Sequence, residues 1–183
     1  IVGLPDPAVR ESKDRLFAAL RNAGFRHPQA RVTVNLAPAD VRKEGPAYDL
    51  PIAIGMLSAS GQLAANLDDA MVIGEIALDG ALRHTNGILP IAVTARARGI
   101  RRIVLPEANA AEAALIGGIE VVAARHLAPL VDHLAGCRPL PPLAAARWCD
   151  PTAPDHLADL ADVRGQEQAR RAVEISAAGG HNL

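Results

Sequence analysis

Helix-like and strand-like segments alternate regularly from residue 88 to residue 134, and this alternation constrains the fold more than any other feature of the chain. The pattern predicts, in order, helix, strand, helix, strand and helix at Ile88–Arg98, Arg101–Leu105, Glu107–Ile116, Ile119–Ala123 and Leu127–Leu134. Strands separated by helices of this length are typical of crossovers that return the chain in the same direction. We therefore expect an α/β (α+β) fold with at least partly parallel strand pairing.

Composition limits how these elements can pack and what they can bind. Of the 183 residues, 50% are hydrophobic but only 2% are aromatic, so the core must be built from Ala, Val, Ile and Leu. The formal net charge of −1 gives no overall attraction to nucleic acid or membrane, so any polyanion site must be local. The longest uncharged run, residues 50–67, is broken by proline, glycine and polar residues, and we expect no membrane span and no signal peptide.

The first half of the chain mixes helix and strand patterns. The predicted elements are a helix at Ala8–Asn22 closed by Gly24, a strand at Arg31–Pro38, a buried helix at Asp49–Ser60, and at Met71–Leu82 a strand pair or a strand with a turn at Asp79 and Gly80.

A proline-rich stretch separates two predicted domains. It carries Pro139, Pro141, Pro142, Pro151 and Pro154, which forbid a regular element. We expect a first domain at residues 1–136, a linker at 137–157 and the opening of a second domain at 158–183. A helix from Gln166 to about Ala178 ends there at two glycines. The chain starts in mid-strand without a methionine and ends without a terminating signal, so we expect a fragment of a longer protein.

The segment KEGPAYD, Lys43 to Asp49, is the first candidate for chemistry. It resembles the K-D-G-P-S-A-G loop that carries the serine of Lon-type Ser-Lys proteases, and Ala47 then stands at the serine position. The segment GEIALDG, residues 74–80, resembles the one before the Lon lysine, which places Leu89 at the lysine position. A methyl and an isobutyl group can neither attack a carbonyl nor accept a proton. The resemblance therefore implies no catalytic residue here.

Two alternatives stay open for this loop. Gly45 and Pro46 could simply form a turn, with Asp49 capping the helix that follows. A residual peptidase would need Tyr48 as its nucleophile and Lys43 as the nearby base.

Longer segments, spread over most of the chain outside the proline-rich stretch, resemble one family. They are similar to the magnesium-chelatase-like AAA+ ATPases known as YifB or competence protein ComM, and they read IVGLPDPAVRES, LRNAGFRHPQARVTVNLAPADVRKEGPAYDLPIAIGML, GEIALDGALRHTNGILPIAVTARARGI, LPEANAAEA and DVRGQEQARRAVEISAAGGHNL. The resemblance implies a Lon-protease-like, ribosomal-protein-S5-domain-2-like mixed sheet with packed helices. The first helix of an AAA+ domain follows, truncated before the G-x-x-x-x-G-K-[ST] loop.

The same resemblance implies a function for the full-length protein. It implies a cytoplasmic ATP-fuelled ring, expected to be a hexamer, that acts as a DNA branch-migration helicase on recombination intermediates during natural transformation. ATP and Mg²⁺ are the implied cofactors of the full-length protein. Without the phosphate-binding loop we expect no cofactor and no ATP hydrolysis from residues 1–183. The alternative function is a chelatase-like or protein-remodelling motor whose N-terminal domain recruits a protein partner.

Residues near the C-terminus are implied to contact nucleotide only in the full-length protein. Val163, Gly165 and Gln166 would line the adenine side of the pocket. The alternative is a helix N-terminus in which Gly165 supplies backbone freedom.

Clusters of arginine are the remaining candidates for binding. Four within seven positions could make two or three DNA phosphate contacts if they share a face, with a solvated helix end as the alternative: Arg96, Arg98, Arg101 and Arg102. Subunit packing, phosphate sensing or solvation are open for a second set, Arg164, Arg170 and Arg171.

No metal site is expected from the histidines and cysteines. His126 and His133 lie too far apart along a helix to share one ion, and Cys137, Cys149 and His156 lack paired spacing.

Overall fold

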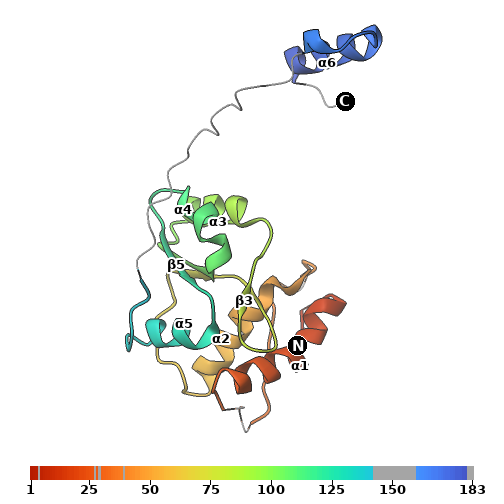
Figure 1. Ribbon diagram of the computed structural model, residues 1–183. Coiled ribbons are helices and arrows are strands. Elements are labelled where there is room, and N and C mark those ends of the chain that lie inside the picture. The colour runs from red at the N-terminus through yellow and green to blue at the C-terminus, as the bar shows by residue number, and fades with distance from the viewer. Residues whose placement is uncertain (4, 27, 29, 39, 142–159, 181–183) are drawn as a thin grey trace. The chain divides into compact units, whose positions relative to one another are not determined.

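The computed structural model of the protein describes residues 1–180 apart from residues 4, 27, 29, 39 and 142–159 (Figure 1). The chain separates into two compact units, Ile1–Arg147 and Trp148–Leu183. The predicted domain boundaries at 136 and 157 stay predictions, because most of the predicted linker lies outside the described residues.

The first unit holds most of the regular structure. Its elements are α1 (Pro7–Asn22), the 3-10 helix η1 (Pro46–Tyr48), α2 (Asp49–Ala59), β1 (Ala70–Val72), β2 (Glu75–Ile76), β3 (Leu82–Arg83), α3 (Ile88–Ala97), β4 (Arg102–Pro106), the 3-10 helix η2 (Glu107–Asn109), α4 (Ala110–Ala114), β5 (Glu120–Ala124) and α5 (Leu127–Leu134). The second unit holds η3 (Leu160–Asp162) and α6 (Glu167–Gly179). None of the helices in the described ranges combines the length and apolar character needed to cross a bilayer.

A parallel sheet with strand order β1-β4-β5 organises the first unit. In its register Met71 lies beside Ile103, and Ile103 lies beside Val121. Helix α3 lies in the connection from β1 to β4, and α4 lies in the connection from β4 to β5. These crossovers return the chain in the same direction, so the predicted α/β class and parallel pairing are confirmed.

A short antiparallel hairpin forms where the sequence predicts a strand pair. Strands β2 and β3 pair Glu75 with Arg83, and the turn between them contains Asp79 and Gly80. The Asp79 carboxylate accepts a hydrogen bond from Ala81 N–H at 3.0 Å, which lowers the Asp79 pKa below its usual value. Gly80 has φ +88°, and a Cβ there would lie 2.8 Å from His126 Cε1, so this turn requires glycine.

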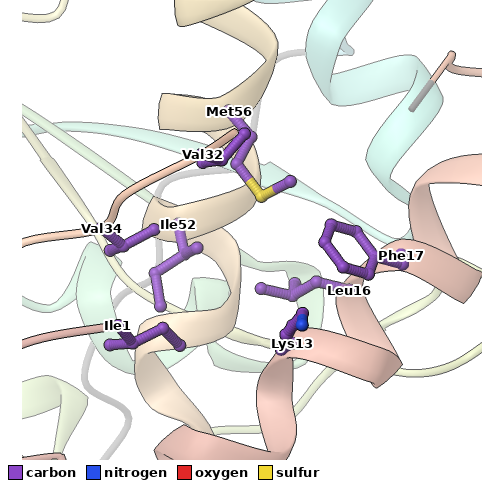
Figure 2. A pocket seen from close by; sticks show the side chains of 8 residues that line it. All are labelled: Ile1, Lys13, Leu16, Phe17, Val32, Val34, Ile52 and Met56. Carbon is purple, nitrogen blue, oxygen red and sulfur yellow. The ribbon is translucent and has the colours of Figure 1, made fainter. Parts of the chain in front are cut away.

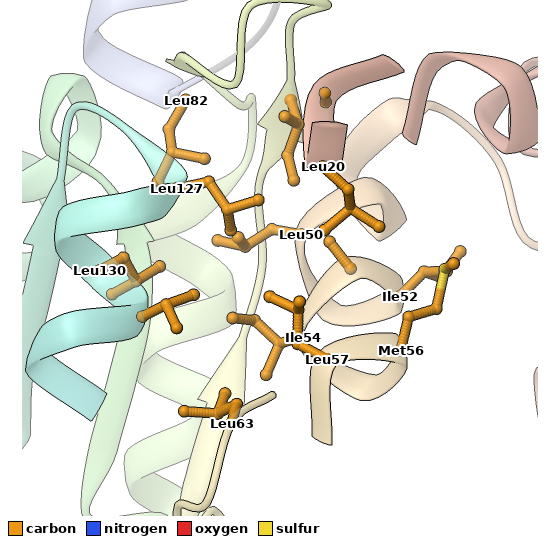
Figure 3. Packing of buried hydrophobic residues seen from close by; sticks show 14 of the residues in the cluster. Leu20, Leu50, Ile52, Ile54, Met56, Leu57, Leu63, Leu82, Leu127 and Leu130 are labelled. Atoms are coloured by element: carbon orange, nitrogen blue, oxygen red, sulfur yellow. The ribbon is translucent and has the colours of Figure 1, made fainter. Parts of the chain in front are cut away.

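The larger apolar core lies between α1, α2 and α5 (Figure 3). Helix α2 projects Leu50, Ile54 and Leu57 toward Leu127 and Leu130 of α5. A smaller cluster packs around α3, β4 and α4, and it consists of Ile88, Ala92, Ile103, Leu105 and Ala113. The largest fully buried side chains in the described residues are all Leu, Ile or Val, as the low aromatic content requires.

The predicted strand at Arg31–Pro38 is wrong. Of these residues only Asn35 forms a bridge, a parallel one with Val2. Val2 N–H donates to Val34 O and Leu36 N–H donates to Val2 O, both at 2.9 Å. Alternating apolar residues show that a segment can pair, but a regular strand needs a neighbour that pairs with it at consecutive positions. Here Val2 alone supplies the bridge.

Candidate functional site

A groove in the first unit is lined in part by the loop at residues 43–49, the segment that the sequence offers as a catalytic candidate. It has a volume of about 630 Å³. The loop and the start of α2 supply one group of lining residues, β1 and its end supply a second, and the segment leading through α3 supplies a third. They are Glu44, Ala47, Tyr48 and Pro51, then Met71, Val72 and Ile73, then Asn86, Pro90, Ile91 and Thr94.

Backbone hydrogen bonds attach the loop to Gly74, which lies between β1 and β2. Gly74 N–H donates to Ala47 O, and Leu50 N–H donates to Gly74 O, both at 2.9 Å. A side chain at Gly74 would crowd this contact, because a Cβ would lie 3.1 Å from Leu50 Cδ2 and 3.2 Å from Pro106 Cγ. Main-chain atoms therefore tie Ala47 and Leu50 to Gly74, and the Asp6 carboxylate accepts a hydrogen bond from Gly45 N–H at 3.0 Å.

An ion pair fixes the start of α2 below the groove loop. Asp49 is fully buried, and its two carboxylate oxygens accept hydrogen bonds from Arg15 of α1 at 2.8 and 3.0 Å. Ile76 N–H also donates to this carboxylate, at 3.3 Å. Hydrogen bonding to Asp49 raises the pKa of the Arg15 guanidinium above its usual value. The pairing is bidentate, the geometry in which guanidinium and carboxylate interact most strongly.

Asp49 therefore does not cap α2 with its side chain, contrary to the turn-and-cap alternative. The residue before α2, Tyr48, has no side-chain capping bond either. Arg15 is a positioning residue that the sequence interpretation missed. The sequence indicates this role of Arg15 only indirectly, since a carboxylate in an apolar helix needs a cationic partner once it is buried.

The structure does not bring together, as groove residues, the two positions that the Lon resemblance marks. Ala47 lines the groove, whereas Leu89 is not among its lining residues and is 38% exposed. Leu89 N–H donates to the Glu112 carboxylate at 2.8 Å. Both side chains are hydrocarbon, so neither position offers a nucleophile or a base.

Lys43, the base considered for Tyr48, is held elsewhere by backbone carbonyls. Its side chain is buried, and its ammonium donates to the carbonyl oxygens of Pro38 and Val41. Tyr48 lines the groove and Lys43 does not. The lysine stabilises the turn before the loop, and it is not placed as a base beside the phenol.

A second, smaller hollow of about 150 Å³ lies beside α1 and α2 (Figure 2). Seven of its lining side chains are apolar, and the eighth is Lys13, whose Nζ lies 5.9 Å from the Phe17 ring centroid. The others are Ile1, Leu16, Val32, Val34, Ile52 and Met56. No nucleophile or carboxylate belongs to this lining, so the larger groove is the better candidate site.

Three of the four clustered arginines have internal partners. Arg96 donates to Gly117 O at 3.1 Å, and ion pairs join Arg101 to Asp69 at 2.8 Å and Arg102 to Glu120 at 3.0 Å. Arg98 follows the last turn of α3 and is exposed. The two carboxylates reduce the local positive charge, and contact with DNA stays a prediction.

The residues expected on the adenine side form a turn before α6. Gly165 and Gln166 both have positive φ, +71° and +56°, and Arg170 donates to Val163 O at 3.3 Å. This geometry fits the alternative in which Gly165 supplies backbone freedom at a helix start. Nucleotide contact by Val163, Gly165 and Gln166 stays a prediction.

One arginine of the second set and two histidines make contacts within the chain, and the role of that arginine set stays a prediction. Arg171 pairs with Glu174 at 3.0 Å. His126 Nε2 contacts Asp79 O at 2.8 Å, and His133 Nδ1 accepts from Leu140 N–H at 3.0 Å. No cluster of three His, Cys, Asp or Glu side chains suited to a metal occurs in the described part of the chain. Cys149 and His156 lie outside that part.

Comparison with known proteins identifies the family of the chain. Residues 1–109 match the family described as subunit ChlI of Mg-chelatase, and residues 159–183 match magnesium chelatase, subunit ChlI. The chain belongs to the magnesium-chelatase ChlI family. This ChlI-family chain is 46% identical over 188 residues to YifB of Escherichia coli and 43% identical over 188 residues to competence protein ComM of Haemophilus influenzae. Each alignment covers 100% of the chain but 36% of the relative, so the chain spans about a third of their length.

A more distant relative supports the Lon-like interpretation of the ChlI-family fold. Lon protease 2 of Bacillus subtilis is 26% identical over 128 residues, which covers 69% of this chain and 23% of that protease. The resemblance to magnesium-chelatase-like, YifB and ComM proteins, and the Lon-like mixed α/β fold, are thus confirmed.

Proposed function

We propose that this ChlI-family chain is the non-catalytic N-terminal part of an AAA+ motor that moves branched DNA during recombination. One observation carries the proposal. In the groove where the Lon-type resemblance places a reactive serine, the chain has the methyl group of Ala47, and the lysine position is Leu89 outside that lining. Without a serine and a lysine at these two positions, the groove offers a binding surface and not the Ser-Lys hydrolytic reaction.

The DNA part of the proposal rests on the relatives. Identity of 43% over the whole chain to a competence protein makes handling of incoming DNA the function to test first. The motor would be a cytoplasmic ring, a hexamer by our proposal, with ATP and Mg²⁺ bound by its AAA+ domain. Val163, Gly165 and Gln166 would then face the adenine, and Arg98 would be the arginine best placed to meet DNA phosphates.

The experiment uses the full-length protein, a four-way DNA junction and ATP. We expect ATP-dependent movement of the junction, with weaker DNA binding in Arg98→Glu. Replacing one phosphate contact should lower the slope of log affinity against log salt by about 1. Arg21→Glu is the matched control, because Arg21 is exposed at the end of α1.

Two results would count against the proposed function. Strong ATP hydrolysis without junction movement would reject the DNA assignment and favour the protein-remodelling alternative. Equal effects of Arg98→Glu and Arg21→Glu would show that the residue 96–102 cluster makes no special contact with DNA.

A further inference from the structure

Strand β1 presents an open backbone edge within the groove. The sheet order ends at β1, whose partner is β4. The register of Met71 with Ile103, together with Ile73 N–H donating to Val104 O at 3.0 Å, directs the backbone groups of Met71 and Ile73 toward β4. Backbone groups alternate along a strand, so the N–H and C=O of Val72 point to the other side. No backbone partner for these two groups lies among the described residues.

The next position along this edge is already paired. Gly74 N–H donates to Ala47 O and Gly74 O accepts from Leu50 N–H, so the loop's backbone occupies the edge there. Pairing therefore stops at Val72, although the groove continues along β1. A segment that offers an acceptor to Val72 N–H and a donor to Val72 C=O would add one more pairing at the edge of β1. An extended polypeptide backbone has that chemistry.

The size and walls of the groove suit such a segment. Its volume of about 630 Å³ lies within the usual range of ligand pockets, about 300–1,000 Å³. Pro51 lies on the loop side, Pro90 and Ile91 come from α3, and Met71 comes from β1. These apolar side chains offer contacts to residues that alternate along an extended peptide.

Charge decides between a peptide and a nucleic acid as the occupant. Glu44 is the one charged residue in the lining, which thus offers no cation to phosphates and favours a neutral or cationic segment. Glu44 contacts Arg42 at 3.3 Å, and both side chains are 68% exposed. Exposed pairs of this kind contribute little to stability, so a cation on the incoming segment can replace Arg42.

We propose that this groove binds an extended peptide segment of a partner protein, which adds to the free edge of β1 at Val72 and places a lysine or arginine near Glu44. The loop that resembles a protease nucleophile loop then serves as one wall of a docking site. This proposal depends on the groove alone and is independent of the proposed action on DNA.

The test uses residues 1–183 and a fluorescein-labelled decapeptide of alternating valine and threonine with one central lysine. We expect saturable binding by fluorescence anisotropy and a shift of the Val72 amide signal in NMR spectra. Thr94→Arg should weaken binding about tenfold or more, because Thr94 lines the groove. Val93→Arg is the matched control on α3, since Val93 is 43% exposed and lies outside the lining, and it should change affinity by less than about twofold.

Two further experiments distinguish specific backbone and charge contacts from nonspecific binding. N-methylation of alternate peptide residues removes backbone donors and should weaken binding about tenfold. Glu44→Gln should weaken binding of the lysine peptide and reduce its dependence on salt.

Any of three results would overturn the proposal. They are no saturable binding up to about 1 mM peptide, equal affinity of the Thr94→Arg and Val93→Arg variants, and displacement of the peptide by a single-stranded oligonucleotide, which would make the groove a nucleic-acid site. The junction assay on the full-length protein is unaffected by these outcomes, so failure here and failure of the DNA proposal are distinguishable.

Discussion

Replacing Arg15 by methionine should destabilise the fold more than replacing its partner Asp49 by asparagine. The asymmetry comes from burial, because the Asp49 side chain is 1% exposed and the Arg15 side chain is 25% exposed. Arg15→Met leaves a buried carboxylate with one remaining bond, from Ile76 N–H at 3.3 Å. Loss of one partner of a buried pair costs about 3–5 kcal/mol. Asp49→Asn leaves a guanidinium that water can reach, and a cost of about 1–3 kcal/mol is expected.

The double variant Arg15→Met, Asp49→Leu makes the prediction sharper. It removes both charges and leaves no unpaired ion at this position, so it should lose less stability than Arg15→Met alone. Urea unfolding of residues 1–183, followed by circular dichroism, measures the three free energies, provided that the slopes agree with the unchanged chain. If Asp49→Asn were the most damaging change, or if the double variant lost as much stability as Arg15→Met alone, the argument from burial would be refuted.

Two further predictions concern the hairpin turn. Gly80→Ala should lower the free energy of unfolding in urea by about 2 kcal/mol, because a Cβ would lie 2.8 Å from His126 Cε1. Gly87→Ala, also at positive φ but with open space around its Cβ, should cost less. Equal losses would attribute the effect to backbone strain alone. The lowered Asp79 pKa stabilises the folded state above the unfolded value near 3.8 and this contribution is lost as pH falls through the folded pKa. The difference in melting temperature between the unchanged chain and Asp79→Ala should thus be present at about pH 6 and shrink below about pH 4, and a difference that grew in acid would contradict it.

Local patterns predicted the part of the fold whose contacts are local. The alternation after residue 88 placed the crossover helices and parallel strands, and the predicted helix Leu127–Leu134 matches α5. The strand expected at Arg31–Pro38 failed, because alternation does not show whether a neighbouring strand is present. Whether a neighbouring strand lies alongside depends on tertiary structure, and the described residues supply only the bridge to Val2.

The sequence indicates which loop lines the candidate groove, but it does not indicate the contacts that support that loop. The loop at Ala47 lies in a groove, yet the Arg15–Asp49 pair joins residues 34 positions apart and leaves no pattern in either helix. The arginine spacing predicts either phosphate contacts or a solvated helix end, and it gives no sign that Asp69 and Glu120 pair with two members of the cluster. Sequence spacing shows which charges are neighbours along the chain and not which ones meet across it.

The main-chain attachment at Gly74 has a consequence for how such a scaffold can evolve. Since the Ala47 carbonyl oxygen, and not its side chain, holds the loop in place, exchange of the side chain at that position leaves the loop's shape unchanged. A reactive group can therefore be lost, or a different one acquired, without rebuilding the surrounding architecture. Proteins with and without a reactive side chain at this position can share one framework for this reason.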